Sequence, residues 1–335
     1  MTGMVAKAGA TADGRSVHSV TLSEGGLALR LLTLGATVQD LRLGGVDWPL
    51  VLGAAEPAAY AGPLVYAGAI VGPVANRIAG ASARIEGRPC RFEANEEATL
   101  LHSGASGLHA RIWEIEAAAP DRATLICHLP DGDGGFPGNR TIRAGFALSA
   151  PGALTLTLTA TSDAATLMNL AHHGYWNLDG TADTRGHRLS VRADRYLPVN
   201  ASLIPEGPPR PVEGTPFDLR AGHRVSEVPA LDHNFCLAPA RQPVTEAATL
   251  TGASGVRLRI ETTEPGLQVY DGRHLAVPPG LGLGGRGYGP FAGIALEPQV
   301  WPDAPNRPDF PPALLPPGET YRQVIRFRLD RVQTP

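Results

Sequence analysis

A strict alternation of apolar and polar side chains runs through the middle of the chain, where the sequence reads Leu154-Thr155-Leu156-Thr157-Leu158-Thr159. Successive side chains of a β-strand point to opposite faces, so this pattern predicts a strand with one buried face and one exposed face. The same period of two returns at residues 257–261 and 325–329. We therefore expect a protein built from strands that cover a core with one face.

Segments before and after this stretch also have the patterns of strands and turns. Residues 83–92 read as a hairpin that turns at Glu86-Gly87. Strand-like segments also occur at residues 28–43, 123–129, 141–149 and 188–193. The 40 glycines and 31 prolines supply frequent turn signals. We find no amphipathic helix longer than two or three turns.

Many short strands separated by turns favour a sandwich or barrel over alternating strands and helices. We predict an all-β fold, a large antiparallel β-sandwich with few or no long helices. No shift of composition marks a boundary, so we expect a single catalytic domain over residues 1–335. Residues 1–15, which lack an apolar stretch, are expected to form a flexible N-terminal tail.

Composition excludes several classes of function. The net charge is −3 with no basic stripe, so we expect no nucleic-acid partner. No apolar run approaches the length of a membrane span, so we expect no membrane partner and a cytoplasmic protein. For the oligomeric state we expect a monomer or a homodimer. Lys7 is the only lysine, which excludes Schiff-base and phosphate-loop chemistry. The three cysteines are far apart and suit neither a disulfide framework nor a metal site, and we expect no cofactor and no metal.

One carboxylate stands out by its position. The apolar run at residues 291–296 predicts a buried strand, and Glu297 follows it directly. Desolvation raises the pKa of a carboxylate and makes it a better proton acceptor near neutral pH. The alternative is a surface glutamate at the point where a strand enters a loop.

Four polar segments flanked by apolar residues accompany this glutamate. They lie at residues 72–78, 101–113, 169–178 and 231–236, with Gln268 between the last of them and Glu297. Together they offer acids, imidazoles, a guanidinium, amides and aromatic faces. Such groups suit a sugar, because hydroxyl pairs need polar partners and pyranose C–H faces need aromatic rings.

The same segments resemble the aldose 1-epimerase (galactose mutarotase) family. The matches follow family order from about residue 25 to residue 330 and include Gly72-x-x-Ala75-Asn76-Arg77-Ile78, Leu101-His102-Ser103-Gly104, the stretch from Asn169-Leu170 to Asn177-Leu178, Asp232-His233-Asn234-Phe235-Cys236, Gly266-Leu267-Gln268-Val269-Tyr270 and Leu296-Glu297-Pro298-Gln299. Two positions depart from the family pattern. Pro73 stands where many members have Arg, and Ser103 stands where they have Gly.

The resemblance implies a fold, an activity and a set of residues. The fold would be the galactose mutarotase-like supersandwich. The activity would be interconversion of the α and β anomers of a free aldose, by acid/base-catalysed opening and closing of the sugar ring. Glu297 would be the general base and His173 the general acid. The substrate-binding residues would be Asn76, Arg77, His102, Asp232 and Gln268.

Strand geometry separates the two adjacent histidines, because His172 and His173 must point to opposite faces of a strand. At most one of them lines a given pocket, which also weakens a metal site built from both. The family pattern selects His173 and leaves His172 a structural role. Trp301, four residues after the proposed base, and Tyr175 are candidates for walls of the site.

Three alternatives stay open at this point. A glycoside hydrolase would pair two carboxylates, here Glu297 and Asp232, across a cleft. An epimerase of sugar 6-phosphates would need a cluster of arginines, for which Arg273 and Arg286 are candidates. A non-catalytic sugar-binding protein would tolerate the loss of the acid or the base, and this chain has both.

Overall fold

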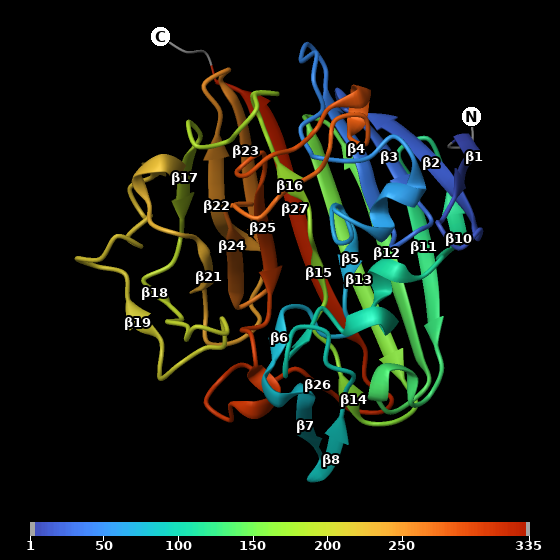
Figure 1. Ribbon diagram of the computed structural model, residues 1–335, viewed down its shortest axis with the longest axis vertical. Coiled ribbons are helices and arrows are strands. Elements are labelled where there is room, and N and C mark those ends of the chain that lie inside the picture. The colour runs from blue at the N-terminus through green and yellow to red at the C-terminus, as the bar shows by residue number, and fades with distance from the viewer. Residues whose placement is uncertain (1–3, 333–335) are drawn as a thin grey trace.

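The computed structural model describes residues 4–332 and is built almost wholly from antiparallel strands (Figure 1). The largest sheet has nine strands in the order β10 (Glu114–Ala118), β11 (Arg122–Leu129), β12 (Arg140–Ser149), β13 (Ala153–Ser162), β27 (Tyr321–Arg331), β23 (Val256–Thr262), β22 (Thr245–Thr251), β17 (Arg188–Val191) and β20 (His223–Arg224). A four-stranded sheet contains β1 (Met4–Ala10), β2 (Ser16–Glu24), β3 (Leu27–Leu32) and β4 (Thr37–Leu43).

A six-stranded sheet and four short strand pairs complete the architecture. The six-stranded order is β16 (Tyr175–Trp176), β25 (Ile294–Gln299), β24 (Gly266–Tyr270), β21 (Asp232–Cys236), β18 (Arg195–Tyr196) and β19 (Arg210–Pro211). The pairs are β5 (Ile70–Val71) with β15 (Ala171–His172), β6 (Arg77–Ile78) with β9 (Leu100–Leu101), β7 (Ser82–Ile85) with β8 (Arg88–Arg91), and β14 (Thr166–Leu167) with β26 (Leu314–Leu315).

Helical structure in residues 4–332 is limited to short 3-10 turns, as the sequence predicts. They are η1 (Pro57–Ala61), η2 (Ala79–Ala81), η3 (Gly104–Ser106), η4 (Leu108–Ala110), η5 (Asp133–Gly135), η6 (Val225–Glu227), η7 (Leu283–Gly285) and η8 (Ala304–Asn306). None of these helices is long and apolar enough to cross a membrane.

The predicted strand segments are confirmed, and so is the hairpin at residues 83–92. In that hairpin β7 pairs with β8, and both turn residues have positive φ, 47° at Glu86 and 77° at Gly87. Positive φ at both central residues is the geometry of a two-residue hairpin turn that matches strand twist. The hairpin projects from one end of the molecule in Figure 1.

The expected N-terminal tail is wrong for residues 4–10, which form β1 and pair with β2 along its length. Backbone pairing with a neighbouring strand does not require an apolar run, which is why composition did not reveal it. Residues 1–3, the start of the expected tail, lie outside the described residues.

The main hydrophobic core is shared by the three large sheets. Its buried side chains come from the four-stranded sheet (Leu29), the nine-stranded sheet (Leu156, Phe327) and the six-stranded sheet (Val269, Leu296). The single domain over residues 1–335 stays a prediction, and a core common to all three sheets is the arrangement expected of one domain. It also fixes the orientation of the six-stranded sheet, which has its apolar face against the core.

Phe327 is a buried core residue that packs against Trp176 and His172. Its fully buried ring lies 5.1 Å from the ring of Trp176 and 5.6 Å, edge-on, from that of His172, measured between centroids. We predict that Phe327→Ala lowers the free energy of unfolding by about 3–5 kcal/mol, because it removes transfer energy and leaves a cavity. Denaturant titration measures this, with Arg322→Ala in the exposed part of the same strand as control, expected within about 0.5 kcal/mol of wild type. Equal effects of the two changes would contradict this account of the core.

Candidate active site

Strand register gathers polar side chains on the face of the six-stranded sheet that points away from the core. Glu297 on β25 pairs with Gln268 on β24, which pairs with Asn234 on β21. Asp232 pairs with Tyr270 two positions further along. Because residues two apart on a strand share a face, these side chains form two adjacent polar rows.

Glu297 is almost completely buried, with 2 % of its surface exposed. Burial raises its pKa well above the usual value, the nearby charge of Asp232 raises it further, and Arg77 lowers it. Among the described residues its Oε2 has no hydrogen-bond partner. A buried carboxylate with a free oxygen is a group prepared to accept a proton from a ligand.

His173 lies beside this carboxylate. Its Nε2 is 3.7 Å from Oε1 of Glu297, and the residue is 5 % exposed. Its backbone is held on both sides, since its N–H donates to the carbonyl of Ala69 and its carbonyl accepts from Gly68 N–H. Burial lowers the pKa of the imidazole to about 4. His172 points the other way, edge-on to Phe327 in the core, as strand alternation predicts.

His102 completes a group of two imidazoles and one carboxylate whose ligand atoms lie within 4.8 Å of one another. Its Nδ1 accepts the backbone N–H of Asn76 at 3.1 Å, which places the proton of the neutral ring on Nε2. Burial lowers the pKa of His102 well below its usual value, so the ring is neutral. Both ring nitrogens are thereby committed, and neither offers a lone pair to a metal. The donor set therefore does not fit a metal ion, whereas Nε2–H of His102 suits a ligand oxygen.

Arg77 is held between two carboxylates, those of Glu96 and Asp232. Its Nε and Nη2 donate to Glu96 at 2.5 and 2.8 Å, and its Nη1 lies 3.9 Å from Oδ2 of Asp232. Burial by itself would lower the pKa of Arg77, but Glu96 and Asp232 raise it, so the guanidinium stays charged. Gln268 in turn donates from Nε2 to Oδ1 of Asp232 at 2.6 Å. The network leaves fixed donors and acceptors facing the same space.

These groups surround a cavity of about 320 Å³, within the usual range of ~300–1,000 Å³ for small-molecule sites. Its walls include six of the residues named from the sequence as catalytic or binding, namely Asn76, Arg77, His102, Asp232, Gln268 and Glu297. Tyr175 also lines it, as expected for a wall. His173 is not part of the wall itself and lies against it, in contact with Glu297 and with the rings of Tyr175 and His102.

Trp301 does not form a wall of the cavity, and that expectation is wrong. Its indole N–H donates to the carbonyl of Pro265, and its ring packs edge-on against Phe310 in a separate apolar cluster. β25 ends at Gln299, so strand alternation no longer fixes the direction of a side chain at position 301.

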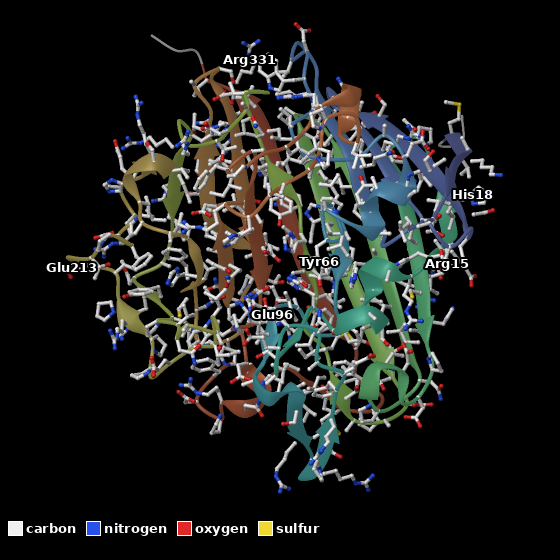
Figure 2. All side chains as sticks on the ribbon, in the orientation of Figure 1. Arg15, His18, Tyr66, Glu96, Glu213 and Arg331 are labelled. Atoms are coloured by element: carbon white, nitrogen blue, oxygen red, sulfur yellow. The ribbon has the colours of Figure 1, made fainter. Side chains whose placement is uncertain are left out.

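The cavity is also lined by Leu101, Tyr270 and His274, and by three residues that were not identified from the sequence, namely Tyr66, Glu96 and Leu203. Figure 2 shows Tyr66 and Glu96 near the centre of the molecule. The ring of Tyr66 lies 4.7 Å from that of His102 and 5.8 Å from that of His173. Glu96 stands in an acidic segment typical of a solvated loop, so its pattern carried no signal.

Ser103, one of the two departures from the family pattern, links two polar segments. Its hydroxyl accepts from the backbone N–H of Val74 at 2.9 Å and donates to the carbonyl of the same residue at 3.1 Å. These bonds join the loop before η3 to the segment that carries Asn76 and Arg77. Pro73 accepts from Asn169 N–H through its carbonyl and does not line the cavity.

The proposed phosphate-binding arginines do not form a cluster. Arg273 donates to Asp271, and Arg286 donates to the carbonyls of Gly180 and Thr181. Neither arginine lines the cavity. The charged residues that line it are Arg77 and three carboxylates, those of Glu96, Asp232 and Glu297.

Comparison with known proteins identifies similar chains over nearly the full length. The family model described as aldose 1-epimerase matches residues 18–328. Galactose mutarotase from Homo sapiens is 35 % identical over 328 residues, 95 % of each chain. Aldose 1-epimerase from Escherichia coli K12 is 31 % identical and covers 94 % of this chain and 96 % of its own.

Solved structures agree with these sequence matches. An aldose epimerase homologue from C. elegans superposes with a TM-score of 0.89 at 29 % identity, covering 94 % of this chain and 99 % of its own. Galactose 1-epimerase from Lactobacillus acidophilus NCFM superposes with a TM-score of 0.84 at 25 % identity, covering 99 % of each chain. The predicted galactose mutarotase-like β-sandwich is confirmed.

The charges around Glu297 give opposite predictions for two of its neighbours. Asp232→Asn removes a negative charge and should lower the pKa of Glu297, whereas Arg77→Met removes a positive charge and should raise it. Carboxyl carbon shifts of labelled glutamate, followed by NMR against pH, measure both changes. Asp13→Asn, an exposed site in another part of the chain, serves as control. Shifts of the same sign in the two variants would refute this electrostatic assignment.

Proposed function

The chain belongs to the aldose 1-epimerase family, and we propose that Glu297 and His173 are the base and the acid with which it interconverts the α and β anomers of a free aldose. The protein is an isomerase. The observation that carries the assignment of residues is the distance of 3.7 Å between Nε2 of His173 and Oε1 of Glu297 at a buried cavity. One base and one acid next to a hemiacetal are sufficient for this reaction.

The reaction begins with a proton transfer at each end of the hemiacetal. Glu297 takes the proton from the hydroxyl on C1 while protonated His173 gives a proton to the ring oxygen. The bond between C1 and the ring oxygen breaks, and C1 becomes an aldehyde. Rotation about C1–C2 presents the other face of the carbonyl. The ring oxygen then attacks it, returning its proton to His173, and the carbonyl oxygen recovers a proton from Glu297.

The active form of the pair carries one proton in total. Burial lowers the pKa of His173 to about 4 and raises that of Glu297, so the pair holds one proton at pH values between the two pKa values. Burial opposes separation of charge between the two groups, and Arg77 favours the ionised carboxylate. The pair therefore titrates as a unit.

Five other residues position the sugar in this proposal. Arg77 and Nε2–H of His102 donate to sugar oxygens, and Asp232 accepts from hydroxyls. Gln268 holds Asp232 and keeps its own Oε1 available. Asn76, whose φ is 61°, presents its backbone N–H to His102 and so sets the tautomer of that ring.

Galactose is the substrate named for several relatives, and we propose galactose and glucose as substrates here. A sugar 6-phosphate fits less well, because Glu96 and Asp232 already balance Arg77 and would repel a phosphate. A glycoside hydrolase would use Asp232 as its second carboxylate, but Asp232 is held by Gln268 and Arg77. A cytoplasmic location, and a monomeric or homodimeric state, stay predictions.

Polarimetry tests the roles of the two residues. Freshly dissolved α-galactose or α-glucose should reach equilibrium rotation faster in the presence of the protein. Glu297→Gln and His173→Asn should each lower kcat by at least about 10²-fold, since a positioned acid or base contributes ~10²–10⁴-fold. The exposed changes Glu319→Gln and His18→Asn are matched controls and should have no effect. Full activity in either active-site variant, with its fold intact by circular dichroism, would exclude that residue from its role.

The pH dependence of kcat/KM should be bell-shaped. Activity falls in acid as the pair takes up a second proton, near the His173 pKa of about 4, and falls in alkali as the pair loses its only proton. The alkaline limb reports the raised pKa of Glu297, so Asp232→Asn should move that limb to lower pH. Rates by polarimetry, corrected for uncatalysed mutarotation at each pH, give the profile. An alkaline limb that does not move in Asp232→Asn would show that Glu297 does not set it.

A further inference from the structure

One aromatic ring lies against three imidazoles beside the cavity. Tyr66 lines the cavity, and the centroid of its ring lies 4.7 Å from those of His102 and His109 and 5.8 Å from that of His173. The rings of Tyr66 and His173 are nearly parallel, with 24° between their planes, whereas those of His102 and His109 are inclined to Tyr66 by 56° and 68°. The reaction proposed above uses His173 and gives Tyr66 no part.

A short turn fixes Tyr66 relative to His173. The backbone N–H of Gly68 donates to the carbonyl of His173 at 2.8 Å, and the carbonyl of Ala69 accepts the N–H of His173 at 2.9 Å. The turn is closed by Ala69 N–H, which donates to the carbonyl of Tyr66 at 3.1 Å. Gly68 has a φ of 70°, and a Cβ there would lie 2.3 Å from the carbonyl oxygen of Val38, so this position requires glycine. The phenol ring and the imidazole are therefore carried by backbone segments that are bonded directly to each other.

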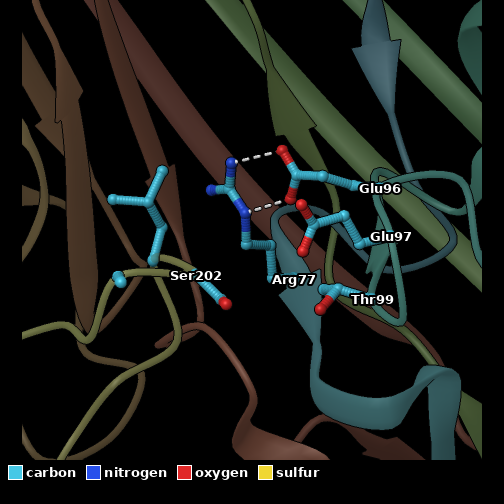
Figure 3. Close-up of a pocket in the computed structure, with 7 residues that line it drawn as sticks. Arg77, Glu96, Glu97, Thr99 and Ser202 are labelled. Atoms are coloured by element: carbon cyan, nitrogen blue, oxygen red, sulfur yellow. Dashed lines mark hydrogen bonds and ion pairs between the residues drawn. The ribbon is translucent and has the colours of Figure 1, made fainter.

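The hydroxyl end of Tyr66 is bonded to the acidic loop. It accepts a long hydrogen bond from Nδ2 of Asn95 at 3.5 Å, and Asn95 is itself held by bonds of 3.1 and 2.7 Å with the backbone of Leu101. Glu96, the next residue, receives the two bonds from Arg77 that Figure 3 shows. The ring of Tyr66 is thus held at both ends. Because the two rings are nearly parallel, the face of Tyr66, and not its hydroxyl, meets His173.

The protonated form of His173 needs support at this position, because burial opposes its charge. Besides Tyr66, the titratable groups that face it are Glu297 on β25, His102 and His109 in the loop after β9, Tyr175 on β16 and the adjacent His172. Of these groups, only the carboxylate of Glu297 attracts a positive charge. An aromatic face within about 6 Å of a cation also attracts it, and does so more strongly where water is excluded.

We propose that Tyr66 is a positioning residue, whose ring face holds the imidazole of His173 beside Glu297 and stabilises that imidazole while it carries the proton. This inference rests on the proposed function, because it requires His173 to act as the acid. Two alternatives make different predictions. If Tyr66 were only a wall for the sugar, its loss would raise KM. If it only packed, its loss would lower stability and leave the pH dependence unchanged.

The test replaces the ring in two ways. Tyr66→Phe keeps the aromatic face and removes the hydroxyl, whereas Tyr66→Leu keeps apolar bulk and removes the face. Tyr66→Met gives the same comparison if the leucine variant does not fold, because methionine adapts to irregular spaces. Tyr196→Leu is the matched control, since the ring of Tyr196 lies 6.1 Å from that of His233 and does not line the cavity. Polarimetry with galactose gives kcat, KM and the pH profile. NMR of histidine-labelled protein gives the titration of the His173 ring, whose signals are identified by their loss in His173→Asn.

We expect Tyr66→Leu to lower kcat by about 3- to 30-fold and to change KM by less than about threefold. A contact that favours the imidazolium raises the pKa of His173, so its removal should lower that pKa and move the acid limb to lower pH by about 0.5–1 unit. Tyr66→Phe should stay within about twofold of wild type in kcat, with its acid limb unmoved. Tyr196→Leu should likewise leave the acid limb in place.

Several results would overturn the role of Tyr66. These are a phenylalanine variant as impaired as the leucine variant, a leucine variant that changes only KM, and an acid limb that stays in place or moves to higher pH. Any of them in an enzyme that accelerates galactose mutarotation would leave the proposed function standing. A wild-type protein that accelerates the mutarotation of no sugar would overturn both inferences.

Discussion

The site depends on keeping a carboxylate and an imidazole 3.7 Å apart and out of water. Removing charged groups from water costs several kcal/mol for each ion, a cost that only a rigid and well-packed scaffold offsets. Here the scaffold is the six-stranded sheet, in which β24 and β25 pair over five consecutive positions. A sheet with a large apolar core behind it can hold polar groups that would otherwise move towards solvent or neutralise each other.

The alternation of β24 and β25 divides their side chains between two tasks. Val269 and Leu296 lie in the core, whereas Gln268 and Glu297, one position away, lie in the site. A slip of one residue in register would exchange these sets, placing a carboxylate in the core and leucine in the cavity. Packing on the core face therefore fixes which side chains of β24 and β25 lie in the site. In the same way, alternation at the end of β15 directs His172 into the core and His173 towards the site.

Local patterns were enough to predict the strands and the hairpin at Glu86-Gly87, because alternation and turn residues act over neighbouring positions. His173 and Glu297 lie more than a hundred positions apart in the sequence. Periodicity could not predict that they are neighbours, whereas the family resemblance did. Neither periodicity nor the family resemblance identified Glu96, because nothing in the sequence of an acidic loop marks a residue that pairs with Arg77. Trp301 was assigned by proximity in sequence to Glu297, which fails once the strand has ended and the chain turns away.

Glu96 also bears on how strong a base Glu297 is. An arginine that paired directly with Glu297 would lower its pKa and make it a weaker base. Arg77 instead gives its two-pronged bond to Glu96 and lies near Asp232, so only part of its field reaches Glu297. Burial and Asp232 then keep the pKa of Glu297 raised. The ion pair between Arg77 and Glu96 thus preserves a strong base beside a guanidinium that can still donate hydrogen bonds to a sugar.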